Sequence, residues 1–407
     1  MDSNVNIDNY LGKYPLLGIN SELMDSYCCL FENYGDFVNQ ETRLKSVHNF
    51  LLSNEHKTRE KCAKDLIKNH WNVHSKKSFY RYLNKLSQIE PGIQVFKETH
   101  RDHVVHTAYT FLLGLHLFKL NKNLRRSIKR YFHENELESY SPMNLNGHEI
   151  FDGFFLENNG QKEPSDDLEL LRFMWLLIST FHDLGYPFES FIYQMGTYIT
   201  HINSLGKDQE EYINISPILP FNEMDKTSIG NSFELLNNIQ KNYNIDGNYL
   251  DLEKYLEDRL KEGFVDHGII SALLLLKTSD ALYMKNPQWN KDFFVKTFPH
   301  IALSIALHNV DWDFAKKNYD KLPEITLEDF PLCYLLIVAD TLQEWDRPAK
   351  SSSYELIKPT NMSIKLDQTR NKFIVGIDSS DEKIMKLNEE FQTKLSSKDV
   401  PIIEKRS

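Results

Sequence analysis

Apolar residues recur three and four positions apart through most of the chain, which is the spacing of helices with a buried face. The first ninety or so residues fit short amphipathic helices, for example TRLKSVHNFLLSNEH and REKCAKDLIKNHWNVH. Five longer and more apolar segments follow, namely HRDHVVHTAYTFLLGLHLFKL, LELLRFMWLLISTFHD, VDHGIISALLLLKTSDALYM, FFVKTFPHIALSIALHN and DFPLCYLLIVADTLQEWDRP. We therefore expect a mainly α fold whose core is built from these five helices.

The period of the pattern changes near the C-terminus. MSIKLD and KFIVGID alternate apolar and polar residues around the turn sequence QTRN, which predicts a β-hairpin. Ser380, followed by Asp381 and Glu382, has the residue types of a helix N-cap and first turn, so a final helix should begin there. We expect three regions. Residues 1–92 should form a helical N-terminal lobe, and residues 351–407 a C-terminal hairpin with a helix. Between them, residues 93–350 should form the helical core, with two polar surface insertions near 134–167 and 206–227.

Composition narrows the class of protein. A chain of 407 residues with 41% hydrophobic content can bury a substantial core. No apolar stretch reaches the roughly 20 residues of a membrane span, and the polar, acidic start MDSNVNIDNYLGKY does not resemble a signal peptide, so we expect a cytoplasmic protein. The four cysteines fit neither a disulfide framework nor a CxxC metal site. A net charge of −11 argues against binding of duplex nucleic acid and favours a small substrate.

Each of the five apolar helices carries a histidine or an aspartate close to one end. These residues are His106, the adjacent pair His182 and Asp183, His267, His308 and Asp340. Burying imidazole or carboxylate groups is costly unless they are paired or coordinated, which favours a shared metal ion. Nitrogen and oxygen ligands without thiolate suit Mn²⁺, Fe²⁺, Co²⁺, Ni²⁺ or Zn²⁺, with Mg²⁺ as a further candidate. The alternative is a set of ordinary helix ends with solvated or hydrogen-bonded side chains.

The order H…HD…H…H…D over residues 93–350 resembles the HD superfamily of metal-dependent phosphohydrolases. The resemblance implies an HD-type helical bundle in which His106, His182, Asp183 and Asp340 are metal ligands. His267 and His308 resemble the additional histidines of members that hold two metals, in which Asp183 would bridge the ions and position the attacking water. Gly185-Tyr186-Pro187 follows the doublet directly, whereas the GYP triplet of the HD-GYP phosphodiesterases lies further downstream, so we interpret it as a helix stop.

The resemblance implies a metal-dependent hydrolase that cleaves a phosphoester of a nucleotide or cyclic (oligo)nucleotide, as a phosphodiesterase does, with one or two divalent metal ions as cofactors. The alternatives are a deoxynucleoside triphosphate triphosphohydrolase, a nucleotide-binding sensor without catalysis, and a helical scaffold that binds no metal. His103 precedes His106 by one helical turn and would act as a general acid for the leaving group. The alternative is a histidine at the surface or behind the ligands, with no catalytic role. Regions outside the core would roof the site, contact a partner or form a homo-oligomer.

Several other polar residues are candidates for supporting roles. Arg101 and Arg347 flank presumed ligands and would clamp a phosphate or form salt bridges at helix ends. Asp102, Asp266 and Glu344 are candidates for orienting ligand imidazoles. The remaining histidines with assigned positions are expected at the surface or half-buried in the N-terminal lobe (His48, His56, His70 and His74) or in the core (His116 and His300).

Overall fold

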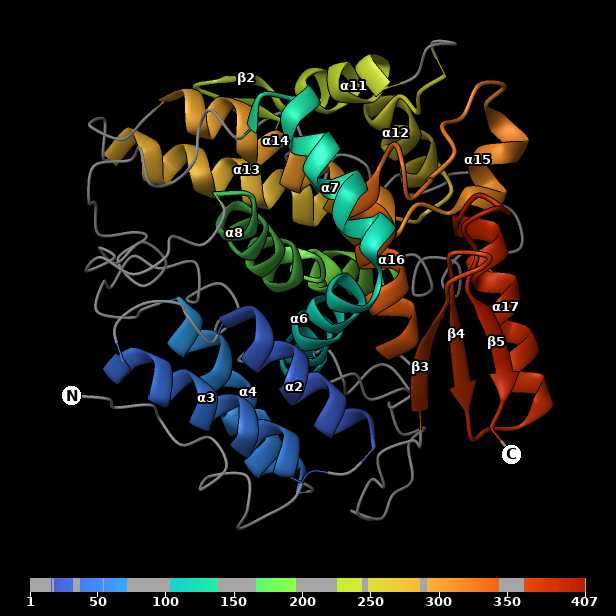
Figure 1. Cartoon of the computed structure of the whole chain (residues 1–407). Helices are drawn as coiled ribbons and strands as arrows, with labels where there is room; N and C mark the ends of the chain where they lie inside the picture. Colours follow the sequence, from blue (N-terminus) through green and yellow to red (C-terminus); the bar gives the residue numbers. More distant parts are fainter. Residues whose placement is uncertain are drawn as a thin grey trace.

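The computed structural model describes residues 16, 18–31, 37–53, 55–71, 103–137, 166–194, 225–243, 248–285, 291–343 and 362–406. The chain is mainly helical with a small sheet near the C-terminus, as predicted (Figure 1). The predicted boundaries at residues 92 and 350 lie outside the described residues, so the division into three regions stays a prediction. In the described part of the chain, no helix has both the length and the apolar character needed to cross a membrane.

The core contains the five apolar helices that the sequence predicts. They are α6 (His103–Leu120), α8 (Asp166–Phe181), α13 (His267–Lys285), α14 (Lys291–His308) and α16 (Pro331–Gln343). Helix α14 packs against α8, α13 and α16, while α6 packs against α8 and α16. Because these helices are apolar over much of their circumference, they are stable only when neighbours surround them, and most of their residues are buried.

Three N-terminal helices, α2 (Ile19–Phe31), α3 (Phe37–Leu52) and α4 (His56–His70), lie together on one side of the core (Figure 1). Both α2 and α4 pack on α6. The prediction that His48 and His70 lie at the surface or are half-buried is wrong, because both are buried. The two ring nitrogens of His70 lie 2.8 Å from the Tyr27 hydroxyl and 2.7 Å from the Leu66 carbonyl, and these hydrogen bonds make its burial tolerable. The side chains of His56 and His74 lie outside the described residues.

Further elements pack around the core. They comprise α7 (Lys122–Glu134), the short pair β1 (Lys226–Thr227) and β2 (Gly230–Asn231), α11 (Ser232–Tyr243), α12 (Leu252–Lys261) and α15 (Trp312–Asn318). Among them, α7 packs on α6 and α16, and α11 packs on α14. The Asn121 side chain caps α7 by accepting hydrogen bonds from the amides of Asn123 and Leu124. Residues 138–165 and 206–224, which make up most of the two predicted insertions, lie outside the described residues.

The C-terminal region contains the predicted hairpin and helix together with one additional strand. Strands β3 (Met362–Asp367) and β4 (Lys372–Ile377) pair antiparallel, and α17 (Asp381–Lys394) begins after Ser380, whose side chain accepts a hydrogen bond from the Lys383 amide. Strand β5 (Ile402–Lys405) then pairs parallel with β4. The sequence did not predict β5, because a run of four residues is too short to show a strand period.

Candidate metal centre

The ends of the five core helices bring all six predicted metal-binding side chains to one place. The residues form two groups that could each hold a metal ion, His106 with His182 and Asp340, and Asp183 with His267 and His308; within each group the ligand atoms lie within 4.8 Å of one another. Five of the six residues are buried, and the Asp340 side chain is 15% exposed. The convergence required for a shared centre is therefore present.

A tight turn at the end of α8 places His182 and Asp183 in the centre. Helix α8 ends at Phe181, and a turn over residues 182–185 follows. A Cβ atom at Gly185 would lie 2.2 Å from the His267 carbonyl oxygen, and the Gly185 amide donates a hydrogen bond to the Ser271 hydroxyl (2.7 Å). Only glycine permits this approach to α13. The interpretation of Gly185-Tyr186-Pro187 as a helix stop is incomplete, because the chain becomes helical again over residues 186–194.

The first group is compact. The Nε2 atom of His106 lies 2.7 Å from Oδ1 of Asp340 and 3.0 Å from Nε2 of His182. The Nε2 atom of His182 lies 3.6 Å from the same Asp340 oxygen. Two ligands bonded to one ion at about 2.1 Å are separated by about 3.0 Å in octahedral geometry and about 3.4 Å in tetrahedral geometry. The observed separations of 2.7, 3.0 and 3.6 Å lie on either side of these values and are close enough for a common ion.

Asp183 connects the two groups through its two carboxylate oxygens. Its Oδ2 atom lies 3.4 Å from Nε2 of His106 and 3.6 Å from Nε2 of His182. Its Oδ1 atom lies 3.2 Å from Nε2 of His267. A carboxylate with one oxygen toward each group has the geometry of a bridging ligand, which is the role that the sequence resemblance implies.

Hydrogen bonds on the outer side of the histidine rings determine which nitrogen faces the centre. Nδ1 of His182 donates to the Ser179 carbonyl (2.9 Å), and Nδ1 of His308 donates to the Ile305 carbonyl (2.5 Å). When either ring is neutral, its one proton is on Nδ1 and Nε2 presents a lone pair to the centre. Nε2 of His308 is buried and makes no hydrogen bond within the described residues. A buried acceptor of this kind fits a metal ligand.

His267 is oriented by a carboxylate that the sequence reasoning missed. Nδ1 of His267 lies 2.5 Å from Oε2 of Glu189, and the Asn309 side-chain amide lies 3.0 Å from the same nitrogen. A histidine that donates Nδ1–H to a carboxylate keeps Nε2 available for a metal. Glu189 could have been found only by recognising that a new helix starts at Tyr186 and turns Glu189 back toward α13.

The electrostatics of the centre are those of a site that requires positive charge. Burial raises the pKa of Asp183 and Asp340, but the surrounding imidazoles outweigh it and hold both pKa values well below the ordinary value. Burial lowers the pKa of His182 and His267, yet the neighbouring carboxylates produce a net increase, to about 10 for His267. In the metal-free chain, protons on His182 and His267 therefore supply the charge that a cation would supply, while burial lowers the pKa of His308 to about 3 and keeps that ring neutral.

The remaining predicted residues lie beside the centre, in the core or outside the described residues. His103 is buried beside the centre, with its ring 4.2 Å from that of Tyr186, which in turn lies 6.0 Å from the ring of His267. The Asp266 carboxylate lies 3.9 Å from Arg259, and burial raises its pKa to about 6. The other predicted residues are either in the core, as expected (His116 and His300), or outside the described residues (Arg101, Asp102, Glu344 and Arg347).

Comparisons of the chain with protein-family models, with curated proteins and with solved structures found no match. The geometry of the six-residue centre therefore has to support any functional assignment by itself.

Proposed function

We propose that the protein is a metal-dependent phosphohydrolase of the HD type, which cleaves a phosphoester of a nucleotide or cyclic (oligo)nucleotide with water. The observation that carries the proposal is the meeting of His106, His182, Asp183 and Asp340, with His267 and His308 beside them, in the chain order H…HD…H…H…D. In the contacts given above, the ligand atoms lie 2.7 to 3.6 Å from one another, and these distances support binding to a common ion.

The roles of the residues follow from their positions. His106, His182 and Asp340 would hold one divalent ion, and His267 and His308 would hold a second, with Asp183 contributing one oxygen to each. A bound divalent ion polarises a phosphoryl oxygen and lowers the pKa of water toward neutrality. The carboxylate of Asp183 would orient the attacking water, since it lies between the two groups.

The leaving oxygen requires a proton, and His103 is the proposed source. It lies on α6 one turn before His106, and it is buried against Tyr186 at the edge of the centre. Glu189 is not placed in contact with substrate in this proposal. Its role is to hold the ring of His267 through Nδ1.

The test is a product assay on the purified chain loaded with Mn²⁺, Fe²⁺ or Mg²⁺. Nucleoside mono- and triphosphates, cyclic dinucleotides and short oligonucleotides are incubated with the protein, and the products are identified by mass spectrometry. Release of a nucleotide from a diester supports a phosphodiesterase, whereas release of tripolyphosphate from a deoxynucleotide supports a triphosphohydrolase. Binding of a nucleotide without turnover in every metal would instead identify a sensor.

The matched variants are His182→Gln in the centre and His116→Gln outside it. Both histidines are buried, and His116 forms a hydrogen bond of 2.8 Å with Ser26. We expect His182→Gln to lose bound metal and hydrolysis, and His116→Gln to keep both. If the metal-loaded chain hydrolyses no phosphoester, or if His182→Gln is as active as the unmodified chain, the proposal is wrong.

A further inference from the structure

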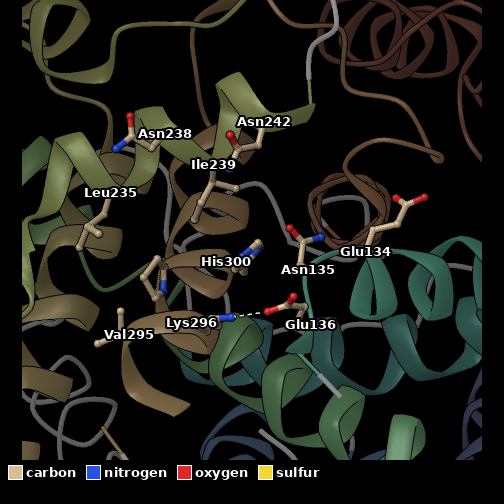
Figure 2. Close-up of a pocket in the computed structure, with 11 residues that line it drawn as sticks. Glu134, Asn135, Glu136, Leu235, Asn238, Ile239, Asn242, Val295, Lys296 and His300 are labelled. Carbon is tan, nitrogen blue, oxygen red and sulfur yellow. Dashed lines mark hydrogen bonds and ion pairs between the residues drawn. The ribbon is translucent and has the colours of Figure 1, made fainter. Parts of the chain in front are cut away.

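A polar cavity that is open to solvent lies outside the candidate metal centre, where three helices meet. Its volume is about 330 Å³. It is lined by the end of α7 (Glu134, Asn135 and Glu136), one face of α11 (Leu235, Asn238, Ile239 and Asn242) and the first half of α14 (Val295, Lys296, Pro299 and His300). Figure 2 shows the α11 side chains on one side, Asn135 and Glu136 on the other, and His300 between them.

The charge of the lining argues against a phosphate or another anion. Lys296 is the cation among the lining residues, and its ammonium group already pairs with Glu136 at 2.6 Å. Glu134 adds a second carboxylate. Burial lowers the pKa of His300 to about 3, so this ring is neutral at physiological pH and supplies no positive charge. The lining therefore disfavours an anionic ligand.

The polar groups of the lining suit a ligand with hydrogen-bond donors and acceptors at its edge. Asn238 and Asn242 are exposed on α11 and lie four residues apart, so both amides face the same side of the helix. His300 is 7% exposed and is held by a hydrogen bond of 2.6 Å between its Nδ1 and the Tyr131 hydroxyl. Side-chain amides recognise the donor and acceptor edges of nucleobases in this way.

The backbone of the cavity also departs from regular helix at two places. Pro299 lies inside α14 and has no N–H, so the carbonyl of Val295 receives no helical hydrogen bond from position 299. Glu136 has a φ of 55°, a left-handed conformation that is uncommon for a residue other than glycine or asparagine. That conformation directs its carboxylate to Lys296 on α14, which joins two walls of the cavity. Glu136 directly follows the C-cap residue Asn135, a position at which helices commonly end in a left-handed residue.

We propose that this cavity binds an uncharged heterocycle of the size of a nucleobase or nucleoside. Leu235, Ile239 and Pro299 supply apolar contacts for the ring faces, while the amides of Asn238 and Asn242 bind its edge. The volume is at the lower end of the range of about 300 to 1,000 Å³ for small-molecule sites. The inference does not rest on the proposed phosphohydrolase activity, because no residue of the metal centre lines the cavity.

The test is a binding titration of the chain with adenosine, guanosine, cytidine and uridine. A chelator is present, so that the metal centre contributes nothing, and binding is followed by saturation-transfer NMR and calorimetry. At least one nucleoside should bind, and its 5′-monophosphate should bind more weakly because of the lining charge. The proposal is overturned if no nucleoside binds at millimolar concentration, or if the monophosphate binds more tightly than the nucleoside.

Variants locate the bound nucleoside. Asn238→Leu combined with Asn242→Leu removes both amides from exposed positions, and we expect affinity to fall at least tenfold. Ile239→Trp places a large ring in the cavity and should abolish binding. Glu234→Leu, also exposed on α11 but outside the lining, is the control and should bind as the unmodified chain does. Unchanged affinity in both Ile239→Trp and the double variant would show that the nucleoside binds elsewhere.

Discussion

Asp183→Asn is the most direct test of the metal centre, because Asp183 is the residue that contacts both ligand groups. Its oxygens lie 3.2 to 3.6 Å from the Nε2 atoms of His267, His106 and His182. Asparagine keeps the shape of the side chain and removes its negative charge. We expect Mn²⁺ affinity to fall about 100-fold or more, since replacement even of residues that only orient a metal ligand costs about 10- to 100-fold.

The thermal shift that follows can be worked out for a chain of this length. Mn²⁺ at 100 times its dissociation constant stabilises the folded state by about 2.7 kcal/mol. For 407 residues the unfolding entropy is about 0.9 kcal/mol per kelvin, so the melting temperature should rise by about 3 °C. A 100-fold weaker affinity at the same Mn²⁺ concentration leaves about 0.4 kcal/mol, a shift below about 1 °C.

Differential scanning fluorimetry of chelator-treated chain, with and without added Mn²⁺, measures this difference. Asp225→Asn is the matched control, because Asp225 is also a buried aspartate and accepts a hydrogen bond of 2.9 Å from Asn231 away from the centre. The control should keep the full shift. Asp183 is not a metal ligand if Asp183→Asn gains as much thermal stability from Mn²⁺ as the unmodified chain, or if elemental analysis finds the same metal content in both.

Three further predictions follow from individual contacts. Glu189→Gln should weaken Mn²⁺ binding about 10- to 100-fold in a calorimetric titration, because the His267 ring loses its carboxylate partner; an unchanged dissociation constant would contradict this. Gly185→Ala should lower the free energy of unfolding in urea by about 1 to 3 kcal/mol, since its Cβ would overlap the His267 carbonyl, and an unchanged urea midpoint would show that the turn relaxes freely. Burial lowers the pKa of His300 from 6.5 to about 3, so the folded state resists protonation of this ring. The free energy of unfolding should therefore decrease as the pH falls from 6.5 toward 3, with a loss of about 2 kcal/mol at pH 5. His300→Gln should remove that part of the acid sensitivity, and equal losses between pH 7 and pH 5 in both chains would be the contrary result.

The sequence predicts the core helices and the six converging residues because both depend on strong local patterns. A helix that is apolar over most of its surface must be buried, so a histidine or aspartate at its end is conspicuous. His106, His308 and Asp340 stand out for this reason, each on a long apolar segment. The hairpin is equally local, since the strand alternation and the turn lie within sixteen residues from Met362 to Ile377.

What the sequence does not predict depends on contacts between distant segments. The partner of His70 is Tyr27, 43 residues away, and the partner of His267 is Glu189, 78 residues away. No period or spacing marks such pairs. Strand β5 is similar, because four residues become a strand only through pairing with β4. The cavity at α7, α11 and α14 likewise exists only once three separate helices have packed.

The charge balance of the candidate centre predicts that a bound metal would add more stability at high pH. Protonation of His267, whose pKa rises from 6.5 to about 10 in the folded state, supplies stability that is fully present below pH 6.5 and is lost as the pH rises through 10. A divalent cation supplies the same positive charge without depending on pH, and it must displace those protons to bind. Metal affinity should therefore increase with pH, and the thermal shift produced by Mn²⁺ should increase with it. Glu189 and then Asp183 hold the proton on His267. Asp183 also faces His106 and His182 on its other side, so a metal would take over one of the carboxylates that retain protons at neutral pH.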